Sequence, residues 1–250
     1  FYTVADFESF DSKSRTWKLK EGVVDSSPLS DTPRPGNAKF KKLTPVDPNS
    51  TNPYQLTEAD RTVIGNTTPK FSGGFGLNAT YKGFDMSMFF NFMYDFDVLN
   101  ANKIMLTTWA DNKENNFLMD IASDKRWRNF DDMGNEIRYS PEVLAEFNKN
   151  ATMWNPTSIG RPICMSYAVE DGSFLRLNSA TLGYTLPSVW TKKVGLSKVR
   201  FYVSGNNLFT LTGYSGYDPE VNIATGLTPN IDYNRYPRSR TYTFGAQLTF

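Results

Sequence analysis

The side chains that usually carry enzyme chemistry are scarce in this sequence. It contains no histidine and a single cysteine, Cys164, which excludes Ser–His–Asp and Cys–His catalysis, an internal disulfide and the common zinc sites. Paired carboxylates could still hydrolyse a glycoside, but no such pair stands on a predicted strand. The sequence therefore predicts a protein that is not an enzyme and needs no cofactor or metal, with Cys164 as a small, inert residue.

Two acidic segments have some of the character of a calcium loop. In the first, Asp218 and Glu220 follow Tyr214 and Tyr217, and this group could bind a ligand or a calcium ion. A calcium ion needs about six to eight oxygen ligands, and the spacing names only two acids, so we favour a loop-shaping role for them. The second segment, 131–136, is better explained as a turn.

Aromatic residues make up 15% of the chain, which suits either a membrane girdle or a sugar-binding surface. Trp109, Trp127 and Trp154 all fall in one long irregular region. They are candidates, with Tyr214, Tyr217 and Asp218, for binding a sugar or peptide substrate or for contacting a partner protein. The alternative is that the tryptophans pack inside large loops.

The overall charge and hydropathy exclude two classes of protein. There are 27 basic and 26 acidic residues, a net charge of +1, so no global field favours nucleic acid. The mean hydropathy is −0.47 and no run of about 18 apolar residues occurs, which excludes a helical membrane protein. A transmembrane barrel remains open, because its lumen face is polar and each strand gives a weak signal.

Alternation of apolar and polar residues predicts the strands. In 84–96, seven apolar residues share one face, and Lys82-Gly83 joins this strand to 71–81 as a hairpin. The last ten residues alternate in the same way, and ten residues let a tilted strand cross the hydrocarbon core of a bilayer. The phase shifts inside 173–186, which a bulge near Asn178-Ser179 would reconcile.

These patterns divide the chain into strands and long excursions. In order, we expect a partial strand at 1–10, a long loop at 11–70, a hairpin at 71–96, a long loop at 97–172, two strands within 173–211, a loop at 212–237 and a terminal strand at 238–250. Within the loops we expect a short hairpin near 17–24 and short helices near 101–110 and 141–149, the latter opened by a serine cap and a proline.

The connections alternate in length. Those at 82–83 and 187–197 are short, and those at 11–70, 97–172 and 212–237 are long. In an antiparallel meander alternate connections lie at opposite ends, so one end carries every short turn. Outer-membrane barrels show this asymmetry, and a soluble sandwich has no reason to. Because five or six strands cannot close such a barrel, we expect an all-β fold made of the C-terminal strands of a larger transmembrane barrel with long extracellular loops.

Several motifs resemble those of SusC/RagA-type TonB-dependent outer-membrane transporters. The matching segments are Thr62–Phe75, Asp171–Asn178, Leu182–Pro187, Val203–Thr210, Gly216–Glu220 and the terminal Phe250. Their order along the chain, from about residue 61 to the end, makes the resemblance specific.

The resemblance implies a barrel of about 22 strands with an N-terminal plug, in the cell outer membrane. Such a transporter imports nutrient oligomers, glycans or peptides, is energised by the TonB complex and is capped by a SusD-like surface lipoprotein. The plug and the TonB-contacting segment are absent from this sequence, and its remaining contacts would be the other barrel strands, lipid and the ligand. The alternative is a soluble all-β glycan-binding module.

The barrel hypothesis fixes which residues face lipid. We expect the apolar face of two strands to contact lipid, through Phe84, Met86, Met88, Phe90, Phe92, Phe244, Ala246 and Leu248. The lumen should then receive Asp85, Ser87, Asn91, Thr243 and Gln247. We expect the short turns at the periplasmic rim, 97–172 and 212–237 outside the cell, and Phe250 as a signal for barrel assembly.

Overall fold

A computed structural model of the chain describes residues 1–29, 32–108, 116–122, 124–159, 163–220 and 229–250. The chain divides into two compact units, and each is built from two separate stretches of sequence. Unit 1 is Phe1–Val63 with Ala101–Met165, and unit 2 is Ile64–Asn100 with Ser166–Phe250. In the described part of the chain, no helix is both long enough and apolar enough to cross a membrane.

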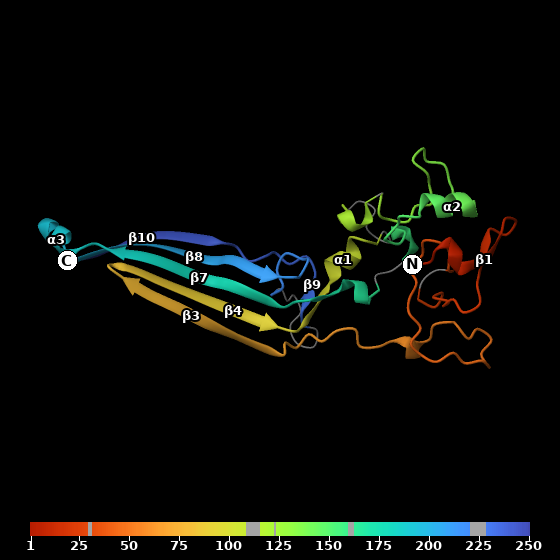
Figure 1. The fold of residues 1–250 in the computed structure, drawn as a ribbon, viewed down its shortest axis with the longest axis horizontal. Coiled ribbons are helices and arrows are strands. Elements are labelled where there is room, and N and C mark those ends of the chain that lie inside the picture. The colour runs from red at the N-terminus through yellow and green to blue at the C-terminus, as the bar shows by residue number, and fades with distance from the viewer. Residues whose placement is uncertain (30–31, 109–115, 123, 160–162, 221–228) are drawn as a thin grey trace. The chain divides into compact units, whose positions relative to one another are not determined.

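Unit 2 holds most of the strands. Its elements are β3 (Phe71–Tyr81), β4 (Phe84–Tyr94), β5 (Asp97–Asn100), the 3₁₀ helix η5 (Ser166–Ala168), β6 (Val169–Asp171), β7 (Phe174–Thr185), α3 (Ser188–Thr191), η6 (Lys192–Val194), β8 (Lys198–Thr212), β9 (Ile231–Asp232) and β10 (Thr241–Thr249). Five of these strands form one sheet in the order β10-β8-β7-β4-β3, and every neighbouring pair is antiparallel. Figure 1 shows these long strands side by side. The sheet is open, so the structure shows an all-β class but not a closed barrel.

The predicted short turns lie at one end of this sheet. Lys82 and Gly83 join β3 to β4, and both have positive φ values of 46° and 88°, as a two-residue hairpin turn requires. The β7–β8 connection contains α3 and η6. Because Phe84 pairs with Tyr184 and Tyr184 pairs with Phe201, both connections leave the same end of the sheet.

The bulge expected in 173–186 is present. Ser179 pairs with Phe89 and Leu177 pairs with Phe90, so Asn178 has no partner on β4. The register against β8 also shifts between Leu177 and Ser179, but there the extra residue is on β8, because Leu177 pairs with Phe209 and Ser179 pairs with Asn206. One extra residue reverses the phase of a strand, and this keeps the apolar residues on both sides of Asn178 on one face.

A second, three-stranded sheet, β6-β5-β9, lies within segments predicted as loops. β5 is antiparallel to β6 and parallel to β9, so the stretches 97–172 and 212–237 are more ordered than the sequence suggests. A small buried cluster belongs to this part of unit 2 and consists of Phe96, Val98, Phe174 and Tyr214. Pairing of strands far apart in sequence cannot be read from local alternation, which explains the omission.

Unit 1 is mainly irregular, with short elements around a small core. They are η1 (Val4–Asp6), β1 (Phe7–Asp11), β2 (Thr16–Leu19), η2 (Glu58–Asp60), α1 (Ala101–Met105), η3 (Met119–Ile121), α2 (Pro141–Phe147) and η4 (Pro156–Ser158). The helices expected near 101 and 141 are therefore present. The core comprises Trp127, Ile137 and Leu144, which are all buried.

The first strand differs from its prediction. The sequence predicts a partial strand at 1–10 and a short hairpin near 17–24. Instead β1 pairs with β2 as a separate hairpin. The rings of Phe7 and Phe10 pack on Trp17 with centroids 5.3 and 4.8 Å apart, and these aromatic contacts explain why the hairpin forms locally.

Candidate functional site

The five-stranded sheet has one face that is apolar across its whole width. Residues directly opposite each other on neighbouring strands share a face, and the registers place the apolar residues of all five strands together. This face carries Phe75, Leu77, Phe84, Met86, Met88, Phe90, Phe92, Leu177, Leu182, Phe201, Val203, Phe209, Phe244, Ala246 and Leu248.

Among the described residues of unit 2, no second sheet buries the apolar face. Phe75 stacks on Phe90 at 4.9 Å, and Phe90 meets Phe209 edge-on, so the rings contact neighbours within the sheet. Phe244 is nevertheless 80% exposed, and Phe201 and Leu248 are each 50% exposed. Large contiguous apolar surfaces of this kind mark contact with a membrane or another protein. The packing that a soluble sandwich would require at Phe244 is not formed.

The opposite face is polar and carries an ion pair that spans three strands. Arg200 on β8 donates from Nε to Asp85 Oδ1 on β4 at 2.9 Å and from Nη2 to Oδ2 at 2.5 Å. Gly183 on β7 lies beneath the pair, and a Cβ there would be 2.4 Å from Arg200 Nη2. The same face holds Ser87, Asn91, Thr243 and Gln247, so the predicted segregation of the two sets of residues is present.

The end of the sheet away from the short turns holds a second ion cluster. Arg176 on β7 donates from Nη2 to Asp218 Oδ1 at 2.5 Å, and both side chains are almost completely buried. Arg176 Nε lies 3.5 Å from Glu220 Oε2, and Arg238 pairs with the other oxygen of Glu220. Burying a charge is tolerated when it is paired, so Arg176 explains why acids occur at 218 and 220.

Tyr214 belongs to this same region and is also buried. Its hydroxyl donates to Asp232 Oδ2 at 2.7 Å, and burial together with this bond raises the pKa of Tyr214 well above its ordinary value. Ser215, the next residue, donates its backbone N–H and its hydroxyl to Glu170. The predicted residues Tyr214 and Asp218 thus each have a partner within the protein, Asp232 for Tyr214 and Arg176 for Asp218.

The two calcium-like segments are explained by protein contacts. In 131–136, Asp131 Oδ1 accepts from the backbone N–H groups of Met133 and Asn135, and Gly134 has a φ of 84°, so the segment is a turn. In the part of the chain that the structure describes, no group of three or more acidic or cysteine residues is arranged to hold a metal ion. Cys164 is exposed.

The other candidate residues differ in exposure. Trp127 is 3% exposed and Trp154 is 9% exposed, so neither ring presents a broad free surface. Tyr217 is 83% exposed and is available for contact. Trp109 lies outside the described residues. Phe250 directly follows β10, and its side chain is 90% exposed.

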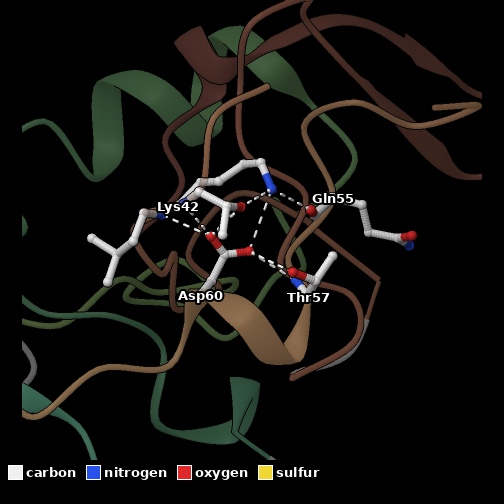
Figure 2. Close-up of polar contacts among 6 residues, drawn as sticks. Lys42, Gln55, Thr57 and Asp60 are labelled. Atoms are coloured by element: carbon white, nitrogen blue, oxygen red, sulfur yellow. Dashed lines mark hydrogen bonds and ion pairs between the residues drawn. The ribbon is translucent and has the colours of Figure 1, made fainter. Parts of the chain in front are cut away.

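Asp60 in unit 1 is a buried carboxylate that the sequence did not single out. Its side chain is 4% exposed, and Figure 2 shows it at the centre of contacts from 42–44 and Thr57. Oδ1 accepts from the backbone N–H groups of Leu43 and Thr44 and from the Thr44 hydroxyl at 2.7–2.8 Å. Oδ2 accepts from Thr57 and lies 3.3 Å from Lys42 Nζ.

These contacts determine the chemistry of Asp60. Burial alone would raise its pKa, but the hydrogen bonds from Thr44, Thr57 and Leu43 hold the pKa far below its ordinary range. Such a carboxylate is a poor proton acceptor, and both of its oxygens are already engaged. We therefore assign Asp60 a structural role, joining 42–44 to 57–60.

Comparison with known proteins places this architecture in a class. No family model matches the chain. It is 35% identical over 202 residues to TonB-dependent receptor P3 of Formosa agariphila, covering 78% of this chain. It is also 38% identical over 88 residues to TonB-dependent receptor SusC of Bacteroides thetaiotaomicron, covering 34% of this chain and 8% of SusC.

A solved structure shares the fold. The RagAB peptide transporter matches 75% of this chain with a TM-score of 0.51 and 26% identity. The chain spans 18% of the length of both this transporter chain and receptor P3. The chain is therefore related to TonB-dependent receptors. The matches include SusC and the RagAB structure, so the resemblance to the SusC/RagA type predicted from the sequence is confirmed.

Proposed function

We propose that this chain is part of an outer-membrane transporter that imports nutrient oligomers, either glycans or peptides, and is energised by the TonB complex. The observation that supports this most directly is the continuous apolar face of the five-stranded sheet, because it is exposed and its composition suits hydrocarbon. The similarity to TonB-dependent receptors supplies the class of transporter.

The dimensions of the sheet agree with a membrane-spanning role. β3 and β4 each have 11 residues and β10 has 9, and a tilted transmembrane strand needs about 9–11. In hydrocarbon, unpaired edge N–H and C=O groups would each cost several kcal/mol. We therefore propose that β3 and β10 pair with further strands of a closed barrel, whose lumen receives the face with Asp85 and Arg200.

The orientation follows from the sorting of the connections. We propose that 82–83 and 187–197 lie at the periplasmic rim and that 97–172 and 212–237 lie outside the cell, as in outer-membrane barrels generally. Two proposals rest on the family resemblance alone: the TonB complex as energy source and a SusD-like lipoprotein as partner. The name of the RagAB structure gives peptides as the cargo of that protein; for this chain we propose glycans or peptides.

Spin labels on the two faces of β10 would test the membrane assignment. In the complete natural protein reconstituted in lipid, with Cys164→Ser as background, we would compare labels at Phe244→Cys and Thr243→Cys. We expect the label at 244 to be relaxed mainly by oxygen, which concentrates in lipid, and the label at 243 mainly by a water-soluble nickel chelate. The same accessibility at both sites, or the reverse order, would exclude a lipid-facing apolar sheet.

A further inference from the structure

Unit 1 contains two adjoining pockets, and the proposed membrane-spanning sheet assigns no role to either. The first has a volume of about 270 Å³ and the second about 390 Å³. They share four lining residues, Asn129, Arg138, Asn155 and Thr157. Two compartments with a common wall suit a ligand of more than one unit, since each alone is at the small end of ligand sites.

The pockets are built from three loops that are tied together. Gly36 has a φ of 88°, and a Cβ there would be 2.2 Å from Cδ1 of Trp127, so the indole lies directly on the glycine. Asn155 donates its backbone N–H to the carbonyl oxygen of Gly36 at 2.8 Å. Ile137 donates its backbone N–H to the carbonyl oxygen of Asn129 at 2.9 Å. These contacts fix the loops around the pocket walls and explain why Trp127 is buried.

The lining has an excess of positive charge. Arg34 and Arg138 line the first pocket, and no acid does so among the described residues. Arg126 and Arg128 line the second, where Asp131 is the acid. Asp131 stays charged within the 131–136 turn and Asp132 pairs with Arg128, so these acids offset part of the charge of the second pocket, and neither of them lines the first.

The two arginines of the first pocket differ in their partners. Arg138 Nε lies 3.3 Å from Glu136 Oε1 but without the geometry of a hydrogen bond. Arg34 is exposed, and no acidic partner for it occurs within the described ranges. Arg34 is therefore available to bind a carboxylate in a bidentate manner, whereas at Arg138 a ligand carboxylate would compete with Glu136.

Three polar side chains of the first pocket also have buried atoms without a hydrogen-bond partner in the described structure. They are Asn129 Oδ1, Arg138 Nε and Ser158 Oγ. Buried polar atoms are usually satisfied, and exceptions call for an explanation. Asn129 Oδ1 can accept from a hydroxyl or amide N–H of a ligand, Arg138 Nε can donate to an acidic group, and the Ser158 hydroxyl can do either.

We propose that the paired pockets form a binding site for a carboxylate-bearing oligomer, with the carboxylate held by Arg34 and Arg138. A uronic-acid glycan and an acidic or free C-terminal peptide share this chemistry. The proposal deepens the proposed function by naming the substrate class, and it rests on that function only for the claim that the bound oligomer is cargo.

The test is binding to the complete natural protein purified in detergent, measured by calorimetry without any transport step. The probes are an oligogalacturonate with its methyl ester, and a short peptide ending in glutamate with its fully amidated form. We expect the acid form of one pair to bind at least about tenfold more tightly than its neutral counterpart, because a hydrogen-bonded charge pair is lost in the neutral form. The preferred pair identifies the source of the carboxylate.

Substitutions of the two arginines test whether the preference for the acid probe arises in the pockets. Arg34→Gln and Arg138→Gln should each weaken the acid probe by about tenfold or more and leave the neutral probe unchanged. Arg61→Gln is the matched control, because Arg61 is an exposed arginine of the same unit that pairs with Glu58 and does not line either pocket. Since Arg34 is exposed, its variant should fold even if Arg138→Gln does not.

The proposal fails if neither acid probe binds, if acid and neutral forms bind equally, or if Arg34→Gln matches the Arg61→Gln control. These outcomes leave the spin-label test on β10 unaffected, so a failed ligand assignment can be distinguished from a failed membrane assignment.

Discussion

Arg200 and Asp85 lie on strands that are not neighbours, and their side chains meet above the backbone of Gly183 on the strand between them. The pair is partly exposed, at 19% for Arg200 and 35% for Asp85, so solvent weakens its net contribution. The ion pair can form in this position because residue 183 is a glycine and has no side chain. Three strands of the polar face are thereby connected at one point.

Replacing Gly183 with alanine should separate this pair. A Cβ at this position would be 2.4 Å from Arg200 Nη2 and 2.6 Å from Asp85 Oδ1. Both atoms are the flexible ends of side chains, so Gly183→Ala should displace the ion pair and lower the stability of the sheet slightly, by more than the control substitution does. Urea unfolding of the protein in detergent measures this. Gly213→Ala is the control, because nothing lies within 4 Å of a Cβ there. Equal effects of the two substitutions would show that the pair tolerates the methyl group.

Asp218→Asn should be more damaging than Glu220→Gln, although both acids contact Arg176. Asp218 and Arg176 are 6% and 2% exposed, and removing one charge from a buried pair costs about 3–5 kcal/mol. Glu220 is 19% exposed and lies 3.5 Å from Arg176 Nε, so its loss should cost about 1 kcal/mol. Amide hydrogen exchange over 213–220 measures both effects. A larger effect of Glu220→Gln would mean that Arg176 is held mainly by Glu220.

Asp60 should confer a pH-dependent stability on 42–60. Its pKa is lower in the folded protein than in the unfolded chain. The ionised carboxylate therefore stabilises the fold above the unfolded pKa of about 3.9, and this stabilisation is lost as pH falls through the folded pKa. Asp60→Asn should raise amide exchange of 42–60 about tenfold at pH 7.

Asp60→Asn should have a smaller effect on the stability of 42–60 at acidic pH. Once exchange is corrected for its intrinsic pH dependence, the difference between Asp60→Asn and the natural protein should shrink between pH 7 and pH 3. Asp47→Asn is the control, since Asp47 is exposed and lies in the same loop. A difference that stays constant over this range would show that the ionised form of Asp60 is not what stabilises the segment.

Local alternation explains why the strands were predictable and many contacts were not. A strand alternates every second residue, so β4 and β10 are visible in short windows, and the phase shift in β7 revealed the bulge at Asn178. Asp60 binds Thr44, 16 residues away, and Arg176 binds Asp218, 42 residues away. No periodic pattern connects such partners, so the pairing of Asp60 with Thr44 and of Arg176 with Asp218 could not be predicted from the sequence.

The exposure of side chains in irregular segments could not be predicted from the sequence either. Trp127 and Trp154 were candidates for ligand stacking because tryptophan suits that role, yet both are buried. The burial of Trp127 depends on Gly36, about 90 residues earlier in the chain. The one available signal was the glycine in Pro35-Gly36-Asn37, which indicates a tight turn but not which side chain lies on it.

Cysteine labelling of intact cells tests the orientation of the proposed barrel. Cys164 is exposed and lies in the stretch proposed to be extracellular, so a membrane-impermeant maleimide should label the natural protein, and Cys164→Ser should lower the signal. In that background, Asn150→Cys should restore labelling and Lys193→Cys should not. Labelling at 193 without labelling at 150 would invert the proposed topology.

The side chain of Phe250 could serve packing or barrel assembly, and the effect of its removal distinguishes these two roles. Its ring is 90% exposed, while its backbone carbonyl accepts from the Ser197 hydroxyl at 3.3 Å. Truncating a buried aromatic residue costs about 3–5 kcal/mol, but an exposed ring has little packing to lose. We therefore expect Phe250→Ala to leave unfolding in detergent nearly unchanged.

We propose instead that Phe250 and β10 form a recognition element for barrel assembly. An edge strand can add to another sheet through its unpaired N–H and C=O groups, and an aromatic residue next to that strand would give the contact specificity. Phe250→Ala should then lower the amount of protein in the outer membrane several-fold. Tyr236→Ala is the control, because Tyr236 is a similarly exposed aromatic residue at 87%. Unchanged outer-membrane levels of the Phe250 variant, or an equal loss for Tyr236→Ala, would remove the assembly role.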